Sequence, residues 1–264
     1  MTGTVYLVGA GPGAPDLLTL RAARLLARAD IVFHDALVHP DAVALATHAI
    51  KVAVGKRCGR HATPQPQIDR QLVDAAAEHA VVVRLKGGDP MLFGRAQDEI
   101  EALEAAGIDY QVVPGVTAAL AAAAEIGTPL TLRGQVRSFA FVTPQTGISQ
   151  PRSGWAEAAR HADGAAIYMG MREAASVARE LIAAGKPAAT PVAIVASASL
   201  AGSGVRYTTL GELPALAARR VEGPVLLLVG PQFRARRRPA RSAGSRAGLQ
   251  HRVPSPVQEV ALTA

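Results

Sequence analysis

Short apolar runs alternate with longer amphipathic stretches along most of this chain. Each run predicts a buried strand, and most are followed by apolar residues at helical spacing. Strands that alternate with helices are typical of an α/β fold in which helices cover a parallel sheet. The predicted strands span residues 5–8, 30–35, 50–54, 81–85, 110–113, 139–143, 165–169, 192–196 and 225–229. The predicted helices begin near residues 17, 41, 63, 97, 117, 155 and 171. The one from residue 41 is expected to extend through His48, and the last one ends before Gly185-Lys186-Pro187.

Glycine turns follow three of the predicted strands. In an open parallel sheet the carboxyl ends of the strands share an edge, where backbone N–H groups come close to ligands. Asp35 and Lys56 end two further strands, so this edge is predicted to bind a ligand. The three turns are Gly9-Ala10-Gly11-Pro12-Gly13, Lys86-Gly87-Gly88-Asp89-Pro90 and Pro114-Gly115-Val116-Thr117-Ala118.

The first turn also satisfies a relaxed dinucleotide-binding pattern. Gly9, Gly11 and Ala14 have the required spacing, and acidic residues follow about twenty positions later. Pro12 and Pro15 argue against this alternative, because they oppose a helix that begins early enough to hold a pyrophosphate. Nicotinamide or flavin binding therefore stays open at this point as the competing hypothesis.

Composition narrows the class of protein. No apolar run approaches the roughly 20 residues of a membrane span, and no basic segment precedes an apolar one at the N-terminus. The single cysteine, Cys58, excludes an internal disulfide and favours a reducing, cytoplasmic location. The seven histidines show no metal-ligand spacing, so we expect no metal site.

The net charge of +7 belongs mostly to the C-terminal stretch. Residues 234–264 hold seven arginines and one acid, Glu259, which leaves the remainder close to neutral. Their lack of periodicity and apolar content predicts a disordered basic tail. Polyanion binding by this tail is a weaker alternative, since no aromatic residues interleave with the arginines from 236 onward.

These motifs, in this order, resemble those of the tetrapyrrole (uroporphyrin-type) methylases, over residues 5–230. The lysine before Gly-Gly-Asp-Pro and the Gly-Lys-Arg loop are most similar to the members that methylate uroporphyrinogen III. The matching motifs are Val8-Gly9-Ala10-Gly11-Pro12-Gly13, Asp35-Ala36-Leu37-Val38, Val54-Gly55-Lys56-Arg57, Val83-Arg84-Leu85-Lys86-Gly87-Gly88-Asp89-Pro90, Val113-Pro114-Gly115-Val116-Thr117-Ala118 and Tyr168-Met169-Gly170.

The resemblance implies two α/β domains, 1–115 and 116–233, with an active-site cleft between them, in a homodimer. It implies S-adenosylmethionine as cofactor, S-adenosylhomocysteine as its product, and two methyl transfers to carbons 2 and 7 of uroporphyrinogen III, which give precorrin-2 for sirohaem or cobalamin. Asp35 would accept a proton and Lys56 would donate one. Cations near the predicted cleft would bind substrate carboxylates: Arg57, Arg60, Arg84 and Lys86. The residues implied at the cofactor are Gly11, Pro12, Gly87, Gly88, Asp89, Leu92, Thr117, Ala118, Met169 and Ala198.

The chain departs from the family pattern in its second half. Thr143-Pro144-Gln145 replaces the usual Thr-Gly-His, Ala198 stands where a glycine is usual, and Ser203-Gly204 replaces Gln-Arg. Ala198 is tolerable wherever its φ stays negative. The same scaffold also serves later precorrins, diphthine synthesis and ribosomal RNA, so these departures bear on the substrate more than on the fold.

Overall fold

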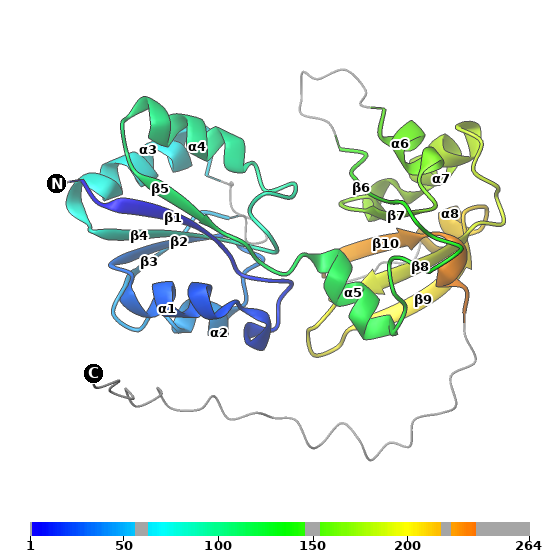
Figure 1. The fold of residues 1–264 in the computed structure, drawn as a ribbon, viewed down its shortest axis with the longest axis horizontal. Helices are drawn as coiled ribbons and strands as arrows, with labels where there is room; N and C mark the ends of the chain where they lie inside the picture. Colours follow the sequence, from blue (N-terminus) through cyan, green and yellow to red (C-terminus); the bar gives the residue numbers. More distant parts are fainter. Residues whose placement is uncertain (1, 56–62, 146–153, 218–222, 236–264) are drawn as a thin grey trace, which may run out of the picture. The chain divides into compact units, whose positions relative to one another are not determined.

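The computed structural model describes residues 2–55, 63–145, 154–217 and 223–235 (Figure 1). Two five-stranded sheets with their helices account for this part of the chain. The first sheet comes from residues 4–113 and the second from residues 139–229. The predicted disordered tail from residue 236 onward lies outside the described residues.

The first sheet is entirely parallel, with strand order β3-β2-β4-β1-β5. Because β1 pairs in parallel with both β4 and β5, the carboxyl ends of these three strands lie side by side at one edge of the sheet, as expected. Its strands are β1 (Thr4–Gly9), β2 (Ile31–His34), β3 (Ile50–Ala53), β4 (Val81–Lys86) and β5 (Tyr110–Val113).

Helices cover both faces of this sheet (Figure 1). Successive side chains of β4 point to opposite faces of the sheet, and both faces carry apolar residues. Val82 packs into the core under α3 and α4, while Val83 and Leu85 pack under α1 and α2. Thr19 caps the first long helix, since its hydroxyl accepts the N–H of Ala22 at 3.1 Å. The helices are η1 (Pro15–Leu17), α1 (Leu20–Arg28), α2 (Pro40–Ala44), α3 (Gln65–Glu78) and α4 (Ala96–Ala105).

The second sheet is mixed rather than parallel, with strand order β6-β7-β10-β8-β9. Strand β10 pairs antiparallel with both β7 and β8, and only β6 and β7 run parallel. The parallel sheet suggested by strand–helix alternation is therefore wrong for this half. Its strands are β6 (Phe139–Val142), β7 (Gly164–Ile167), β8 (Pro191–Ala196), β9 (Gly204–Thr209) and β10 (Val225–Val229).

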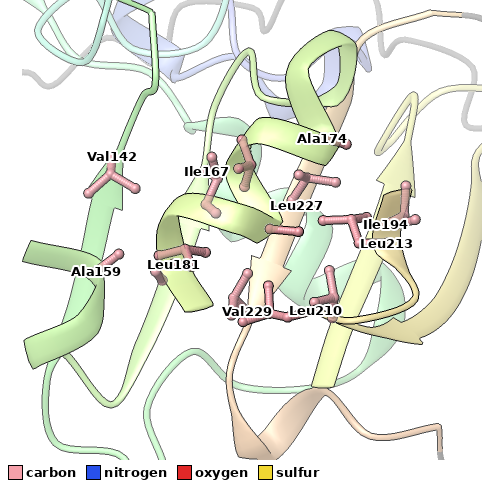
Figure 2. Packing of buried hydrophobic residues seen from close by; sticks show 14 of the residues in the cluster. Val142, Ala159, Ile167, Ala174, Leu181, Ile194, Leu210, Leu213, Leu227 and Val229 are labelled. Carbon is pink, nitrogen blue, oxygen red and sulfur yellow. The ribbon is translucent and has the colours of Figure 1, made fainter. Parts of the chain in front are cut away.

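Two apolar cores hold the second sheet. One core joins the sheet to α6 and α7 and includes Ile167, Leu181 and Leu227 (Figure 2). On the opposite face the alanine-rich α5 packs through Ala119 and Ala122 against β8 and β10, where small side chains permit close approach. The helices are α5 (Ala118–Ile126), α6 (Trp155–His161), η2 (Met171–Glu173), α7 (Ala174–Ala183), α8 (Leu213–Ala217) and η3 (Pro231–Phe233).

Several elements differ from the sequence predictions, and the short helix α8 (Leu213–Ala217) has no predicted counterpart. Strand β9 has no counterpart among the predicted strands, because it is an edge strand of exposed and half-exposed residues without an apolar run. The helix expected through His48 ends at Ala44. The first long helix begins at Leu20 rather than Leu17, after a 3₁₀ turn. No helix in the described part of the chain is both long and apolar enough to cross a bilayer.

Candidate active site

The first two glycine turns are hydrogen-bonded to each other. The Gly88 N–H donates to the Gly11 carbonyl at 2.7 Å, and the Gly11 N–H donates to the Gly88 carbonyl at 3.2 Å. Gly11 and Gly88 have φ of +75° and +70°, a conformation that glycine adopts without strain. The turns after β1 and β4 thus form one continuous backbone surface.

The third turn packs against the same surface. A Cβ on Gly115 would lie 2.2 Å from the Gly88 carbonyl oxygen, and a Cβ on Gly9 would lie 2.6 Å from the Gly115 backbone. Only glycine permits that approach. All three predicted glycine turns therefore meet at one edge of the first sheet, as expected from its parallel topology.

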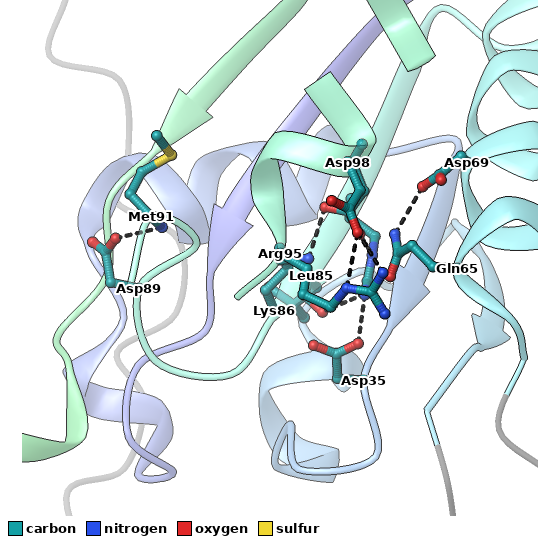
Figure 3. A network of polar contacts seen from close by, with 11 residues as sticks. Asp35, Gln65, Asp69, Leu85, Lys86, Asp89, Met91, Arg95 and Asp98 are labelled. Carbon is teal, nitrogen blue, oxygen red and sulfur yellow. Dashed lines mark hydrogen bonds and ion pairs between the residues drawn. The ribbon is translucent and has the colours of Figure 1, made fainter. Parts of the chain in front are cut away.

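Asp89 ties two of these turns together. Its Oδ2 accepts the N–H of Gly115 at 2.9 Å, and its Oδ1 accepts the N–H of Met91 at 2.8 Å (Figure 3). A carboxylate that accepts two backbone donors fixes the loop around it. The structure thus assigns Asp89 a loop-shaping contact, and its role toward a cofactor stays a prediction.

Tyr168, the residue after β7, reaches the start of α5. Its hydroxyl lies 2.6 Å from Thr117 Oγ1 and accepts the N–H of Ala119 at 3.2 Å. Thr117 precedes the helix without capping it, so the tyrosine takes the capping role. Burial raises the pKa of Tyr168, against smaller opposing effects of the Thr117 and Ala119 hydrogen bonds.

Two exposed apolar residues lie next to Tyr168: Phe93 packs its ring against the tyrosine ring, and Met169 follows Tyr168 in the sequence. The Phe93 ring lies 5.1 Å from the Tyr168 ring, measured between centroids, and Phe93 has φ of +53°. Met169 has φ of +56° and is 44% exposed. Left-handed backbone in residues with side chains costs free energy and concentrates at binding sites. Phe93 and Met169 therefore make this surface a candidate ligand site.

The loop between β8 and β9 contacts the first glycine turn. The Ala14 N–H donates to Ser199 Oγ at 3.1 Å, and a Cβ on Gly13 would lie 2.7 Å from the Leu200 side chain. Ala198 is buried and is not among the residues of positive φ, so alanine replaces glycine there without backbone strain, as predicted.

Four charged side chains form a network of ion pairs near the same sheet edge: Asp35, Arg84, Lys86 and Glu99. Arg84 and Lys86 both project from β4 into the protein, where Glu99 of α4 bonds to Arg84 Nε at 2.8 Å and to Lys86 Nζ at 2.7 Å. Arg84 Nη2 also donates to Asp35 Oδ1 at 2.5 Å. Figure 3 shows Asp35 and Lys86 at this network.

Burial and charge act differently on the two cations. Burial lowers the Arg84 pKa, but the charges of Asp35 and Glu99 outweigh it, so the net shift is upward. The Lys86 pKa is lowered, by burial and then by the Arg84 charge, with Glu99 opposing. Only about 3% of either side chain is exposed, and both cations are paired with protein carboxylates. Their predicted contact with substrate stays a prediction.

The remaining predicted residues fall into two groups. Pro12, Leu92 and Ala118 are half-buried near the glycine turns, and Gly87 is exposed at the end of β4. Lys56, Arg57 and Arg60 lie outside the described residues, so the predicted proton donor and two predicted substrate contacts stay predictions. Within the described ranges no group of three or more metal-ligating side chains occurs.

Sequence reasoning missed Glu99 and the hydroxyl of Tyr168. Glu99 shares a buried helix face with Ala96, Ile100 and Leu103, and a carboxylate on an apolar stripe was the available signal. Tyr168 had a weaker signal, since it stands inside a matching motif but no spacing links it to Thr117. Sequence alone could not identify the partner of either residue.

Comparisons with known proteins bear on the family and the fold of this chain. The sequence profile described as Tetrapyrrole (Corrin/Porphyrin) Methylases matches residues 4–214. A siroheme synthase of Azotobacter vinelandii is 48% identical over 236 residues, which cover 89% of this chain and 51% of the relative. The chain therefore spans about half the length of this curated relative.

Solved structures match over nearly their full length. A uroporphyrin-III C-methyltransferase from Thermus thermophilus, complexed with S-adenosylhomocysteine, is 38% identical with a TM-score of 0.76, covering 87% of this chain and 98% of that one. A cobalt precorrin-4 methyltransferase of cobalamin biosynthesis is 28% identical with a TM-score of 0.76, covering 88% and 96%. The mixed second sheet and the parallel first sheet are thus those of a known fold.

Proposed function

Since this chain belongs to the tetrapyrrole (corrin/porphyrin) methylase family, we propose that it transfers methyl groups from S-adenosylmethionine to carbons 2 and 7 of uroporphyrinogen III, giving precorrin-2. The observation that carries the proposal is the convergence of three glycine turns at one sheet edge. Tyr168, which precedes the left-handed Met169, contacts Thr117 of the third turn. The similarity to a uroporphyrin-III C-methyltransferase structure supports the choice of substrate.

The residues at the edge fit S-adenosylmethionine. A Cβ on Gly88 would meet no atom within 4 Å, so the turn presents bare backbone to open space. Met169 adds an exposed apolar side chain, and Thr117 and Ala118 lie at the start of α5. When bound, the cofactor supplies a methyl group that its sulfonium charge has already activated.

The helix position argues against dinucleotide binding. A dinucleotide site needs a helix N-terminus at the glycine turn to hold the pyrophosphate. In this chain α1 begins at Leu20, after Pro15–Leu17 has formed a separate 3₁₀ turn. The sequence-based objection from Pro12 and Pro15 is thereby supported, and the nicotinamide alternative loses its main structural requirement.

Asp35 is the proposed proton acceptor. A ring carbon that gains a methyl group leaves a positively charged ring, and loss of a proton to a carboxylate restores neutrality. Asp35 follows β2, and its side chain is 32% exposed. Its Oδ1 is bonded to Arg84, and within the described ranges Oδ2 has no hydrogen-bond partner and is available to take the proton. Lys56, as proton donor, completes the proposal from outside the described residues.

The experiment is methylation of anaerobically prepared uroporphyrinogen III with S-adenosylmethionine, followed by mass spectrometry. Addition of two methyl groups supports the proposal. Addition of a single methyl group would contradict the proposed second transfer. If protein that binds S-adenosylhomocysteine adds no methyl group, uroporphyrinogen III is not the substrate. Calorimetric titration with S-adenosylhomocysteine and with NADH is the control, and heat from NADH alone would overturn the methylase assignment.

A further inference from the structure

Arg84 is placed to orient one carboxylate at the sheet edge. Its guanidinium donates to Asp35 Oδ1 through Nη2, to Glu99 Oε1 through Nε and to the Leu85 carbonyl through Nη1, at 2.5, 2.8 and 3.3 Å. These contacts come from β4, from α4 and from the residue after β2. Arg84 therefore fixes the position of Asp35 relative to the strand that carries the second glycine turn.

Glu99 holds the arginine in that orientation. It is fully buried, and its second oxygen bonds to Lys86 Nζ at 2.7 Å. Two cations on one strand, two residues apart, repel each other in a buried setting, and a carboxylate between them removes that repulsion. Two positive and two negative charges make the group neutral, so the arrangement is fixed without a net buried charge.

Among the described residues, Lys86 also acts on the Asp35 carboxylate through its charge, but its ion pair is with Glu99. The His34 ring lies near the Asp35 backbone oxygen, at 3.3 Å from Nδ1, rather than near the carboxylate. On α4 the neighbouring Asp98 pairs with Arg95 at the surface instead. Arg84 is thus the cation that contacts the Asp35 side chain in this part of the structure.

We propose that Arg84 and Glu99 are positioning residues for the reaction, with Arg84 holding the carboxylate of Asp35 at the reacting edge and Glu99 holding Arg84. The inference rests on the proposed role of Asp35 as proton acceptor. It changes the expectation for Arg84, which becomes a residue that acts through Asp35 instead of one that binds substrate carboxylates.

The test separates positioning from substrate binding. In Arg84→Met we expect kcat to fall at least tenfold, while the KM for uroporphyrinogen III and the affinity for S-adenosylhomocysteine change less than threefold. Binding of uroporphyrin III, the oxidised analogue, should likewise stay within threefold by fluorescence quenching. Arg84→Lys should recover part of kcat. A raised KM with unchanged kcat, or weakened uroporphyrin binding, would overturn the inference.

Glu99→Gln provides the second arm, with Asp98→Asn as its matched control. The Glu99→Gln substitution would leave two buried cations opposite a neutral amide, so kcat should fall severalfold. Asp98 is the preceding residue on the same helix, and loss of its exposed pair with Arg95 should leave kcat unchanged. Equal kcat in Glu99→Gln and Asp98→Asn would contradict the role of Glu99.

A double variant that keeps the group neutral controls for loss of activity caused by unfolding. Removing one charge from a buried group of four can destabilise the fold, so Arg84→Gln/Glu99→Gln removes one of each sign. It should fold, bind S-adenosylhomocysteine and show the same loss of kcat. Full kcat in this variant would overturn the inference. The proposed function fails separately, if the unsubstituted protein adds no methyl group to uroporphyrinogen III.

Discussion

The N–H of Ala14 donates a hydrogen bond to the hydroxyl of Ser199, across 185 positions of sequence. Ser199 is held in turn, because its N–H donates to Glu125 Oε2 at 3.1 Å. Ser203 donates its hydroxyl to the other oxygen of Glu125 at 2.5 Å. Glu125, near the end of α5, therefore anchors the loop between β8 and β9 at two points, and Ser199 joins that loop to the first glycine turn.

This relationship predicts weaker cofactor binding in Ser199→Ala. The loop carries Ala198, a proposed cofactor contact, and a hydrogen bond between neutral groups contributes about 1 kcal/mol. We expect the Kd for S-adenosylhomocysteine to rise about fivefold, measured by calorimetry. Thr208→Ala is the control, because Thr208 lies on β9 of the same hairpin and its hydroxyl bonds to Glu212, beyond the strand, at 3.3 Å. Equal affinities in the two variants would mean that the Ala14 contact does not shape the site.

Tyr168→Phe tests the link between β7 and α5. The substitution keeps the ring against Phe93 but leaves the Ala119 N–H without its acceptor. We expect the free energy of unfolding to fall by about 1–2 kcal/mol, as measured with urea. Because burial raises the Tyr168 pKa, the hydroxyl stays protonated near neutral pH and the loss should be constant between pH 6 and 9.

Tyr110→Phe is the matched control for this prediction. The Tyr110 hydroxyl also makes a hydrogen bond, to Glu104 at 2.8 Å, but that contact is exposed. Its removal should change the free energy of unfolding by less than about 0.5 kcal/mol. A similar loss in both variants would show that the contacts of Tyr168 with Thr117 and Ala119 add nothing beyond an ordinary surface hydrogen bond.

Lys186→Met probes the end of α6. Lys186 Nζ donates to the carbonyls of Ala159 and Ala162, at 2.8 and 3.0 Å, and so caps the helix. Without this charged donor the buried carbonyls lose their partner, and we expect a loss of about 1–3 kcal/mol of unfolding free energy. Chemical denaturation at pH 7 measures it. Unchanged stability would contradict the capping role.

The same residue predicts a pH dependence. Burial lowers the pKa of Lys186 below 10.5, with Asp163 opposing and Arg160 adding to the shift. Between the folded and unfolded pKa values the unfolded chain binds more protons, so this group makes stability rise with pH there. The stability difference between the unsubstituted protein and Lys186→Met should therefore grow as pH approaches 10.5. If the stability difference shrinks as pH rises over this range, the predicted direction of the Lys186 pKa shift is wrong.

The sequence could predict the glycine edge because two kinds of information agreed there. Apolar runs placed the strands, and parallel pairing requires their ends to share an edge, so Gly11, Gly88 and Gly115 had to meet. Strand direction in the second sheet had no such signal, since the buried run of β10 looks the same whether its neighbours are parallel or antiparallel. The spacing of apolar residues distinguishes a strand from a helix, but it does not show which strands pair or in which direction.

The charge network shows a second limit. Arg84 and Lys86 stand beside the second glycine turn and carry the right charge, which is why the sequence suggests substrate contacts for them. Their alternation with Val83 and Leu85 places them on one face of β4, and helices cover both faces. The sequence does not show that α4 brings Glu99 against that face. A cation beside a predicted site can thus bind the protein itself, and only the three-dimensional partner distinguishes the two cases.

Gly88→Ala tests whether the space above the second glycine turn is the cofactor site. An added Cβ at Gly88 would meet no protein atom within 4 Å, so the substitution adds a methyl group to open space. Its φ of +70° makes alanine unfavourable by about 1–2 kcal/mol. Folding should survive this cost, while a bound cofactor that lies against the bare backbone would meet the new methyl group. We expect the Kd for S-adenosylhomocysteine to rise more than tenfold.

Gly107→Ala separates backbone strain from obstruction of the site. Gly107 follows α4 and has φ of +67°, and its added Cβ would also meet no atom within 4 Å. The two variants should therefore lose similar amounts of unfolding free energy in urea titrations. Only Gly88→Ala should lose cofactor affinity, because Gly107 lies at the helix end away from the glycine turns. If both variants bind S-adenosylhomocysteine as the unsubstituted protein does, the cofactor does not lie against Gly88, and the proposed site is wrong at its centre.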